Sequence, residues 1–213
     1  MYQTILFDLD GTLTDSGQGI LNSVAYALNQ MGIEEPNPEN LKCFIGPPLY
    51  ESFARFYQLN PADTQAAVDA FRVYFKEKGM FENQLYDGVI PLLEALTEAG
   101  KTLAIATSNP EVFAKQILEY FGIAHYFDVI AGASLDSSRV NKSDVISYAL
   151  AQLDYDPQTT IMVGDREHDI EGAQANQLAS IGVLYGYGNR QELEKAGATM
   201  IAESILDLKQ LLV

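Results

Sequence analysis

Two aspartates near the start of the chain are the first residues whose types and spacing suggest chemistry. Asp8 and Asp10 follow the apolar run Thr4–Phe7, which predicts a buried strand that stops at a polar tip. Because side chains alternate along a strand, we expect both carboxylates on one face, within reach of one site. Two carboxylates at such a short distance repel each other, and the pKa of at least one of them rises unless a cation lies between them. The pair therefore predicts a metal site, although Asp-Gly also fits an ordinary turn, with Gly11 supplying the required φ.

Further polar residues follow other predicted strands or precede a predicted helix. Apolar strands are expected over 102–106 and 160–163, and helices over 143–153 and around 171–176. The polar residues beside them are Thr107, Ser108, Asn109, Lys142, Gly164, Asp165 and Asp169. Singly, each fits a strand-end turn, a helix cap, a surface lysine or a solvated loop, and Asn109-Pro110 has the pattern of a helix cap followed by proline. Because ligands bind at the carboxyl ends of parallel strands and at helix N-termini, their joint occurrence favours one shared site.

The apolar pattern divides the chain into two parts. Residues 16–80 show helical spacing and no strand pattern. Helices are expected there over 16–31, 49–59 and 61–78. From residue 86 onward, helices and apolar strands alternate, which is typical of a parallel sheet covered on both faces. We therefore predict an α/β fold in which residues 1–15 and 82–213 form the core and residues 16–81 form a helical domain.

Composition and charge narrow the classes of function. The chain of 213 residues carries a formal net charge of −16, which would repel nucleic acid and anionic membrane surfaces. A phosphate substrate would meet the same repulsion, so its site would need a local positive centre. Cys43 is the single cysteine, which excludes an intramolecular disulfide and fits a reducing cytosol. No signal-peptide pattern and no apolar run near the ~18 residues of a membrane span is present, so we expect a cytoplasmic protein.

The motifs, taken in order, resemble those of the haloacid dehalogenase superfamily. They are Asp8-Leu9-Asp10-Gly11-Thr12, Thr107, Lys142 and Gly164-Asp165-Arg166-Glu167-His168-Asp169. The resemblance covers essentially the whole chain and implies a Rossmann-like parallel-sheet core with a small all-helical cap domain inserted after the first strand. Within the superfamily, Phe44-Ile45-Gly46-Pro47-Pro48-Leu49 is similar to the cap segment of the phosphoglycolate phosphatase and 5'-nucleotidase-like branch.

This resemblance implies a role for each motif residue. Asp8 would be the nucleophile that forms an aspartyl-phosphate, and Asp10 would act as general acid and then as general base. Lys142 would neutralise the nucleophile and the phosphate together, and Thr107 would bind a phosphate oxygen. Further substrate-binding residues would be Gly11, Thr12, Ser108, Asn109, Gly46 and Pro47.

The resemblance also implies a bound Mg²⁺. Its protein ligands would be Asp8, the main-chain carbonyl of Asp10, and Asp165, because Mg²⁺ prefers oxygen ligands and keeps several waters. Asp169 would orient these ligands rather than bind the ion directly.

The expected activity is hydrolysis of a small phosphate monoester, either 2-phosphoglycolate or a nucleoside 5'-monophosphate. A dehalogenase is disfavoured because halide displacement does not need the second acid, Asp10. A phosphomutase similar to beta-phosphoglucomutase shares every core motif and stays open as an alternative. A non-catalytic regulatory or binding module on the same fold is a second alternative, from another class of function. The expected partner is a small phosphorylated metabolite, and the sequence fits a monomer and a homodimer alike.

Overall fold

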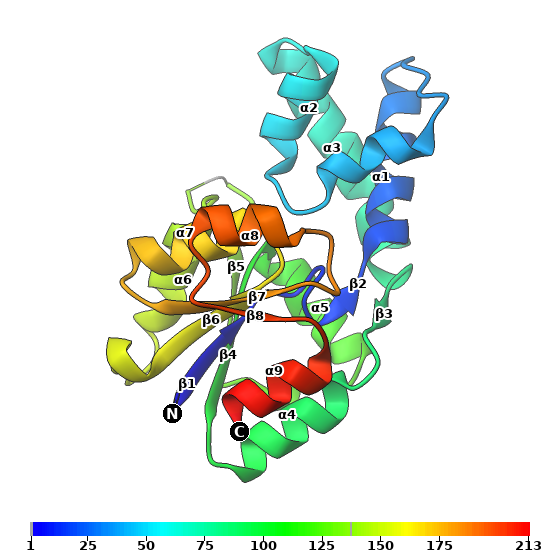
Figure 1. The fold of residues 1–213 in the computed structure, drawn as a ribbon. Coiled ribbons are helices and arrows are strands. Elements are labelled where there is room, and N and C mark those ends of the chain that lie inside the picture. Colours follow the sequence, from blue (N-terminus) through cyan, green and yellow to red (C-terminus); the bar gives the residue numbers. More distant parts are fainter. Residues whose placement is uncertain (1, 137) are drawn as a thin grey trace. The chain divides into compact units, whose positions relative to one another are not determined.

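The chain forms two compact units. The computed structural model describes residues 2–136 and 138–213 (Figure 1). One unit contains the residues up to Thr14 together with Leu85–Val213, and the other is Asp15–Gln84. The chain passes between them through the two short strands β2 (Thr14–Asp15) and β3 (Gln84–Leu85), which pair in a small sheet.

The first unit is built on a six-stranded sheet in the order β5-β4-β1-β6-β7-β8. Its strands are β1 (Thr4–Phe7), β4 (Thr102–Pro110), β5 (Val129–Ala133), β6 (Thr160–Gly164), β7 (Ala179–Val183) and β8 (Met200–Ala202). Every neighbouring pair is parallel. All residues of β1 and β6 are buried, as expected of strands covered on both faces. The predicted α/β class with a Rossmann-like parallel sheet is confirmed.

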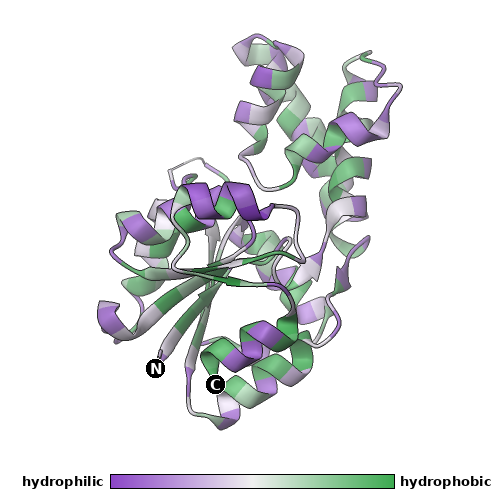
Figure 2. Cartoon of the chain, in the orientation of Figure 1, coloured by the Kyte–Doolittle hydropathy of each residue, from purple (hydrophilic) through white to green (hydrophobic). Residues whose placement is uncertain are grey.

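Helices cover this sheet on both sides. They are α4 (Val89–Glu98), α5 (Glu111–Tyr120), α6 (Lys142–Leu150), α7 (Glu167–Ala175), α8 (Arg190–Ala196) and α9 (Ile205–Leu212), with short 3₁₀ turns η3 (Ala124–Tyr126) and η4 (Pro157–Thr159). Figure 1 shows α6, α7 and α8 on one side of the sheet and α4 and α9 together on the other. Hydrophobic residues run along the strands and along α4, whereas α8 is mostly hydrophilic (Figure 2). One core cluster joins Leu6, Ala104 and Met162 of the sheet to Ile146 of α6 and Ala173 of α7.

The strand register places the carboxyl ends of the central strands side by side. Phe7, the last residue of β1, pairs with Ile105 of β4 and with Val163 of β6. From β1 the chain first builds the β4-β5 side of the sheet and then crosses to the β6-β7-β8 side. The reversal of strand order is therefore at β1, which is where ligands bind in open α/β sheets.

One local prediction at these strand ends is wrong. Strand β1 ends at Phe7, as the sequence predicts, and Asp8 and Asp10 lie just beyond it. Strand β4 continues through Pro110, and α5 begins at Glu111 without a side-chain cap from Asn109. The Asn-Pro pair forms the end of a strand here because the Asn109 side chain is bound elsewhere, as described below.

The second unit is helical. It contains α1 (Gly17–Gln30), the 3₁₀ helix η1 (Pro38–Phe44), α2 (Leu49–Tyr57), α3 (Pro61–Glu77) and the short η2 (Gly79–Phe81). Asn60 caps α3 by accepting a hydrogen bond from the backbone N–H of Asp63 at 3.0 Å, and α3 begins at Pro61, where a helix is expected. Phe44 of η1 and Phe53 of α2 pack with ring centroids 4.8 Å apart. Helices α1 and α3 pack against each other.

Among the residues that the structure describes, no helix is both long enough and apolar enough to cross a membrane.

Candidate functional site

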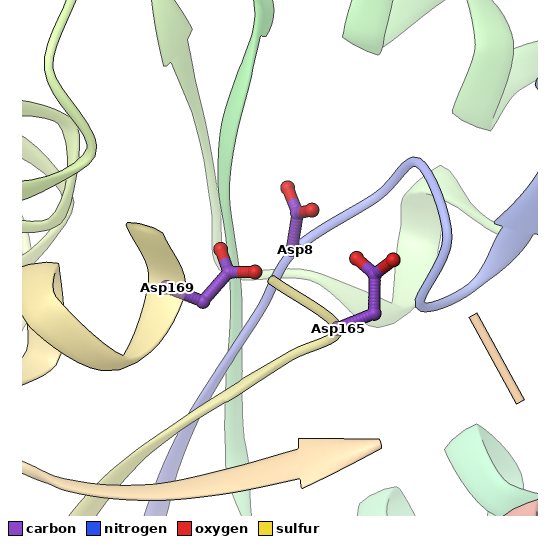
Figure 3. Close-up of side chains that lie close together, drawn as sticks. All are labelled: Asp8, Asp165 and Asp169. Atoms are coloured by element: carbon purple, nitrogen blue, oxygen red, sulfur yellow. The ribbon is translucent and has the colours of Figure 1, made fainter. Parts of the chain in front are cut away.

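Three buried carboxylates gather at the carboxyl edge of the sheet in the first unit. They belong to Asp8 after β1, Asp165 after β6 and Asp169 in the first turn of α7 (Figure 3). One oxygen from each lies within 4.8 Å of the other two, and all three residues are buried. Such a group of hard oxygen ligands is suited to a cation.

The backbone around the cluster fixes these carboxylates. The backbone N–H of Asp8 donates to Val163 O at 2.9 Å, which extends the ladder between β1 and β6 by one residue. Asp169 Oδ2 accepts a hydrogen bond from the backbone N–H of Arg166 at 3.0 Å and so caps α7. Because of this cap, α7 begins at Glu167, several residues before the helix expected around 171–176.

Lys142 supplies the positive charge of the cluster. It is the first residue of α6 and is buried. Its Nζ lies 2.7 Å from Asp8 Oδ1 and 2.8 Å from Asp169 Oδ1, and it also donates to Ala106 O at 3.1 Å. Burial alone would lower the pKa of this ammonium, but Asp169 and Asp8 raise it above its usual range. Lys142 is therefore charged throughout the physiological pH range.

One ammonium does not balance three carboxylates. Burial, together with repulsion from Asp169 and Asp10, raises the pKa of Asp8 to about 7 even though Lys142 lowers it. Burial and the charges of Asp169 and Asp8 also raise the pKa of Asp165 well above its usual range. With all three acids ionised, the cluster has an excess of two negative charges, which a divalent cation would neutralise.

The residues of the cluster fit such a cation. Within the described chain, Asp165 Oδ1 is buried and has no hydrogen-bond partner. Both oxygens of Asp169 are engaged, one by Lys142 and the other by the backbone of Arg166. Asp8 and Asp165 are therefore the carboxylates better placed to bind the ion, and Asp169 is better placed to hold Lys142.

A glycine-rich loop that sequence reasoning missed holds Asp165 in place. The backbone N–H of Tyr187 donates to Asp165 Oδ2 at 2.7 Å. A Cβ atom added at Gly11, Gly186 or Gly188 would overlap atoms of Asp165, so three glycines from two segments enclose this residue. The pattern Gly186-Tyr187-Gly188 shortly after β7 is a signal that could have drawn attention to the loop.

Asp10 faces a different partner. Asn109 Nδ2 donates to Asp10 Oδ2 at 2.9 Å, and the backbone N–H of Asn109 donates to Thr107 Oγ1 at 3.1 Å. Thr107 is buried at the end of the regular part of β4, and Ser108 next to it is half-buried. The side chain of Asp10 is thus held by the β4 end, outside the cluster of three carboxylates.

The remaining predicted residues lie in two places. Gly11 has φ of 87°, so the predicted tight turn with positive φ is confirmed. Thr12 is buried, and its carbonyl oxygen accepts a hydrogen bond from the Tyr185 hydroxyl at 3.1 Å. Gly46, with φ of 105°, and Pro47 belong to the second unit and are not among the residues that the first unit gathers.

Comparison with known proteins identifies the family. A family model described as haloacid dehalogenase-like hydrolase matches residues 5–183. The chain belongs to this family. The predicted family resemblance is therefore confirmed, and the four motifs that carried it lie in the first unit.

Similar proteins of this hydrolase family have several names. A 5'-nucleotidase of Pseudomonas aeruginosa is 42% identical over 99% of this chain and 96% of its own length. A tyrosine-protein kinase, PtkA, of Mycobacterium tuberculosis is 43% identical over 99% of this chain and 72% of its own length. A phosphoglycolate phosphatase of Agrobacterium fabrum is 31% identical over 85% of this chain and 80% of its own length. The crystal structure of a predicted phosphatase from Clostridium acetobutylicum matches with a TM-score of 0.96 and 48% identity over 100% of this chain and 98% of that one.

Proposed function

We propose that this haloacid dehalogenase-like hydrolase is a Mg²⁺-dependent phosphatase that hydrolyses a small phosphate monoester through an aspartyl-phosphate on Asp8. The observation that carries this proposal is the position of the Lys142 ammonium, 2.7 Å from Asp8 Oδ1 in a buried site. A negatively charged nucleophile can approach a negatively charged phosphate only if positive charge accompanies it. Lys142 provides that charge in a protein whose net charge is −16.

In the first half of the reaction, Asp8 attacks the phosphorus atom of the ester. A bond forms between a carboxylate oxygen of Asp8 and phosphorus while the bond between phosphorus and the leaving oxygen breaks. The carboxyl group of Asp10 gives its proton to that oxygen, so the product leaves as an alcohol. Thr107 and the backbone N–H of Ser108 bind equatorial oxygens of the phosphoryl group.

In the second half, the aspartyl-phosphate is hydrolysed. Asp10, now a carboxylate, takes a proton from a water molecule whose oxygen attacks phosphorus. The bond between phosphorus and Asp8 breaks, which releases inorganic phosphate and restores both carboxyl groups to their starting states. In the resting site, Asp169 and Asp8 raise the pKa of Lys142 above its usual range, and beside a negatively charged phosphoryl group Lys142 would stay charged through both halves.

Asp8, Asp165 and the main-chain carbonyl of Asp10 would hold the Mg²⁺. The buried Oδ1 of Asp165 without a partner and the excess negative charge of the cluster support this assignment. When bound, the ion supplies positive charge to the phosphate oxygens and to the attacking carboxylate. Asp169 holds Lys142 and keeps it directed at Asp8.

The helical second unit, Asp15–Gln84, would serve as the cap that selects the substrate. Relatives named 5'-nucleotidase and phosphoglycolate phosphatase support a nucleoside 5'-monophosphate or 2-phosphoglycolate as substrate. The partner is thus a small phosphorylated metabolite. Nucleic acid and membranes are not proposed as partners, since the net charge of −16 disfavours both.

The variant Asp8→Asn tests the reaction. It removes the nucleophile with little change in volume, and we expect kcat to fall by at least about a thousandfold. Phosphate release from 2-phosphoglycolate and from nucleoside monophosphates is measured with Mg²⁺ and with a chelator. Hydrolysis that persists undiminished in pure Asp8→Asn protein would show that the proposed nucleophile is wrong.

The same assay tests the alternatives. Hexose phosphates are included because a phosphomutase would isomerise them faster than it releases phosphate. ATP with a tyrosine-containing peptide is included because one relative is named a tyrosine-protein kinase. Transfer to the peptide or isomerisation of a sugar phosphate, with negligible release of phosphate from every ester, would overturn the phosphatase proposal.

A further inference from the structure

We propose that Asn109 is a positioning residue for Asp10, and that its side-chain amide sets the orientation in which the Asp10 carboxyl group exchanges the proton. This inference rests on the proposed function, because Asp10 is the proton-transfer residue of the proposed reaction. It assigns to the Asn109 side chain a role that differs from binding the substrate through the backbone.

The hydrogen bond between the two side chains has a defined direction. Asn109 Nδ2 is 2.9 Å from Asp10 Oδ2, and an amide nitrogen is a donor with no acceptor capacity. The reverse orientation would set the amide oxygen against a carboxyl oxygen and place two acceptors in contact whenever Asp10 is ionised. The bond therefore favours the amide orientation observed and fixes the rotation of the Asp10 carboxyl group.

The backbone of Asn109 is also fixed by a hydrogen bond. The backbone N–H of Asn109 donates to Thr107 Oγ1 at 3.1 Å, and Thr107 is buried. The pairing of β4 with β5 shifts register between Thr107 and Pro110, so the strand end departs from a regular ladder at Asn109. This irregular end directs the Asn109 side chain toward Asp10, although 99 residues separate them in the sequence.

The chemical consequence follows from this bond. The hydrogen bond from Asn109 Nδ2 occupies one lone pair of Asp10 Oδ2 and favours one rotation of the carboxyl group. Asp10 would then give the proton to the leaving oxygen, and recover one from water, in that rotation. A carboxyl group that is fixed in rotation has the same orientation in both halves of the reaction, which lowers the entropic cost of each proton transfer.

The test compares two esters that differ in their need for a proton. An alkyl phosphate such as 2-phosphoglycolate releases a strongly basic alkoxide unless the leaving oxygen is protonated. 4-Nitrophenyl phosphate releases a stable phenolate without help. We expect Asn109→Ala to lower kcat/KM for the alkyl ester by about tenfold or more and for the aryl ester by less than about threefold. A purely structural defect would lower both values by the same factor.

Two further variants complete the experiment. Asn109→Asp has the same shape but replaces the donor with an acceptor, so its selective loss on the alkyl ester should be larger than that of Asn109→Ala. Asn60→Ala removes an amide that caps α3 in the second unit, and it should lower thermal stability without changing the ratio of the two kcat/KM values. Asp10→Asn should show the largest selective loss, and adding Asn109→Ala to it should have little further effect.

The outcomes separate the inference from the proposed function. If Asp10→Asn is selective for the alkyl ester and Asn109→Ala is not, the inference is wrong and the proposed function stands. Equal or higher activity of Asn109→Ala on the alkyl ester would also overturn it, since the bond would then hold Asp10 in an unproductive orientation. If wild-type protein hydrolyses neither ester, or if Asp10→Asn is not selective, the proposed role of Asp10 fails and the inference fails with it.

Discussion

The two units of the chain differ in what they bury. Among the described residues, every buried charged side chain lies in the first unit: Asp8, Lys101, Lys142, Asp165 and Asp169. The buried polar residues of the second unit, from Ser16 to Thr64, carry uncharged hydroxyl groups, and its interior is apolar and aromatic. Its ion pairs, Lys42 with Glu39 and Arg72 with Asp69, are at least partly exposed.

The two units therefore differ in the free-energy cost of burying charged groups. Burying an ionised group is unfavourable unless it is paired, and the pairing around Asp8 leaves an excess of negative charge. Such an arrangement is poor as a means of stabilising a fold but suitable for binding a cation and a phosphate. The second unit shows no comparable cost among its described residues, which supports the proposal that the chemistry takes place in the first unit.

The largest expected effect on stability follows from removing Lys142. Lys142→Met leaves Asp8 and Asp169 buried without their partner, and we expect the free energy of unfolding at pH 7 to fall by about 3 kcal/mol. The folded-state pKa of Lys142 lies above its unfolded value, so its stabilising effect is fully present at pH 7 and is lost only at strongly alkaline pH. Denaturant unfolding without Mg²⁺ measures the change.

Lys101→Met is the matched control for this prediction. Lys101 is as buried as Lys142, 8% against 7% exposed, but its Nζ donates to the carbonyl oxygen of Tyr2. Its loss leaves no buried carboxylate unpaired, so it should cost clearly less. Equal losses in the two variants would contradict the account of the cluster.

The next effect is the coupling between Mg²⁺, pH and stability. The pKa of Asp8 is about 7 in the folded protein against 3.8 for an unperturbed aspartate, so the folded state binds more protons between those values. Without metal, stability should therefore fall as the pH rises from about 4 to about 7. Mg²⁺ competes with those protons, so it should stabilise the protein more at pH 8 than at pH 5.5. At pH 8 and a hundred times its dissociation constant, Mg²⁺ should raise the free energy of unfolding by about 2.7 kcal/mol.

Asp165→Asn sharpens this prediction. It removes one carboxylate, so the metal-free protein should be more stable than the wild type at pH 8, and the stabilisation by Mg²⁺ should largely disappear. Thermal unfolding at the two pH values, with and without Mg²⁺, measures both changes. A stabilisation by Mg²⁺ that is independent of pH and survives in Asp165→Asn would place the ion elsewhere.

A smaller effect is expected from the loop that encloses Asp165. Gly186→Ala adds a Cβ that would overlap Gly11 O and the Asp165 side chain, and we expect Mg²⁺ affinity to fall by about tenfold. Titration calorimetry measures it without catalysis. Gly100→Ala is the control, because its Cβ would enter open space while its φ of 71° still costs about 1 kcal/mol. Unchanged affinity in Gly186→Ala would remove the loop from the account of the site.

The smallest effect is expected in the second unit. Tyr57→Phe removes the hydrogen bond from the Tyr57 hydroxyl to Glu35 Oε2, which is 3.0 Å long, and should cost about 1 kcal/mol of stability. Mg²⁺ affinity should not change, because this contact lies within the second unit. A change in Mg²⁺ affinity comparable to that of Gly186→Ala would contradict the proposal that cation binding depends on the first unit alone.

Much of the fold could be predicted from the sequence because its signals are local. The apolar run before Asp8 predicts β1 with the correct bounds, and the cap and proline at Asn60-Pro61 predict the start of α3. The Asn109-Pro110 pair has the same local pattern but forms the end of a strand, because Asn109 is bound to Asp10 and Thr107. Tertiary contacts outweighed the local preference there.

The details of the site depend on contacts between distant segments. The bond from Tyr187 to Asp165 involves a backbone N–H, which leaves no mark on residue type, and it joins residues 22 apart. The enclosure of Asp165 by glycines depends on how the first turn after β1 meets the loop after β7. Motif spacing therefore indicated which residues gather at the strand ends, while the means of holding Asp165 and Asp10 required the structure.

The most direct test of the central claim is to trap the phosphoryl group. Wild-type protein is mixed with excess substrate and Mg²⁺, quenched in acid during turnover, digested, and analysed by mass spectrometry. The account predicts a phosphorylated peptide that contains Asp8, loses its phosphate on treatment with hydroxylamine, and is absent from Asp8→Asn protein. Turnover without any such peptide, combined with wild-type hydrolysis by Asp8→Asn protein, would contradict it.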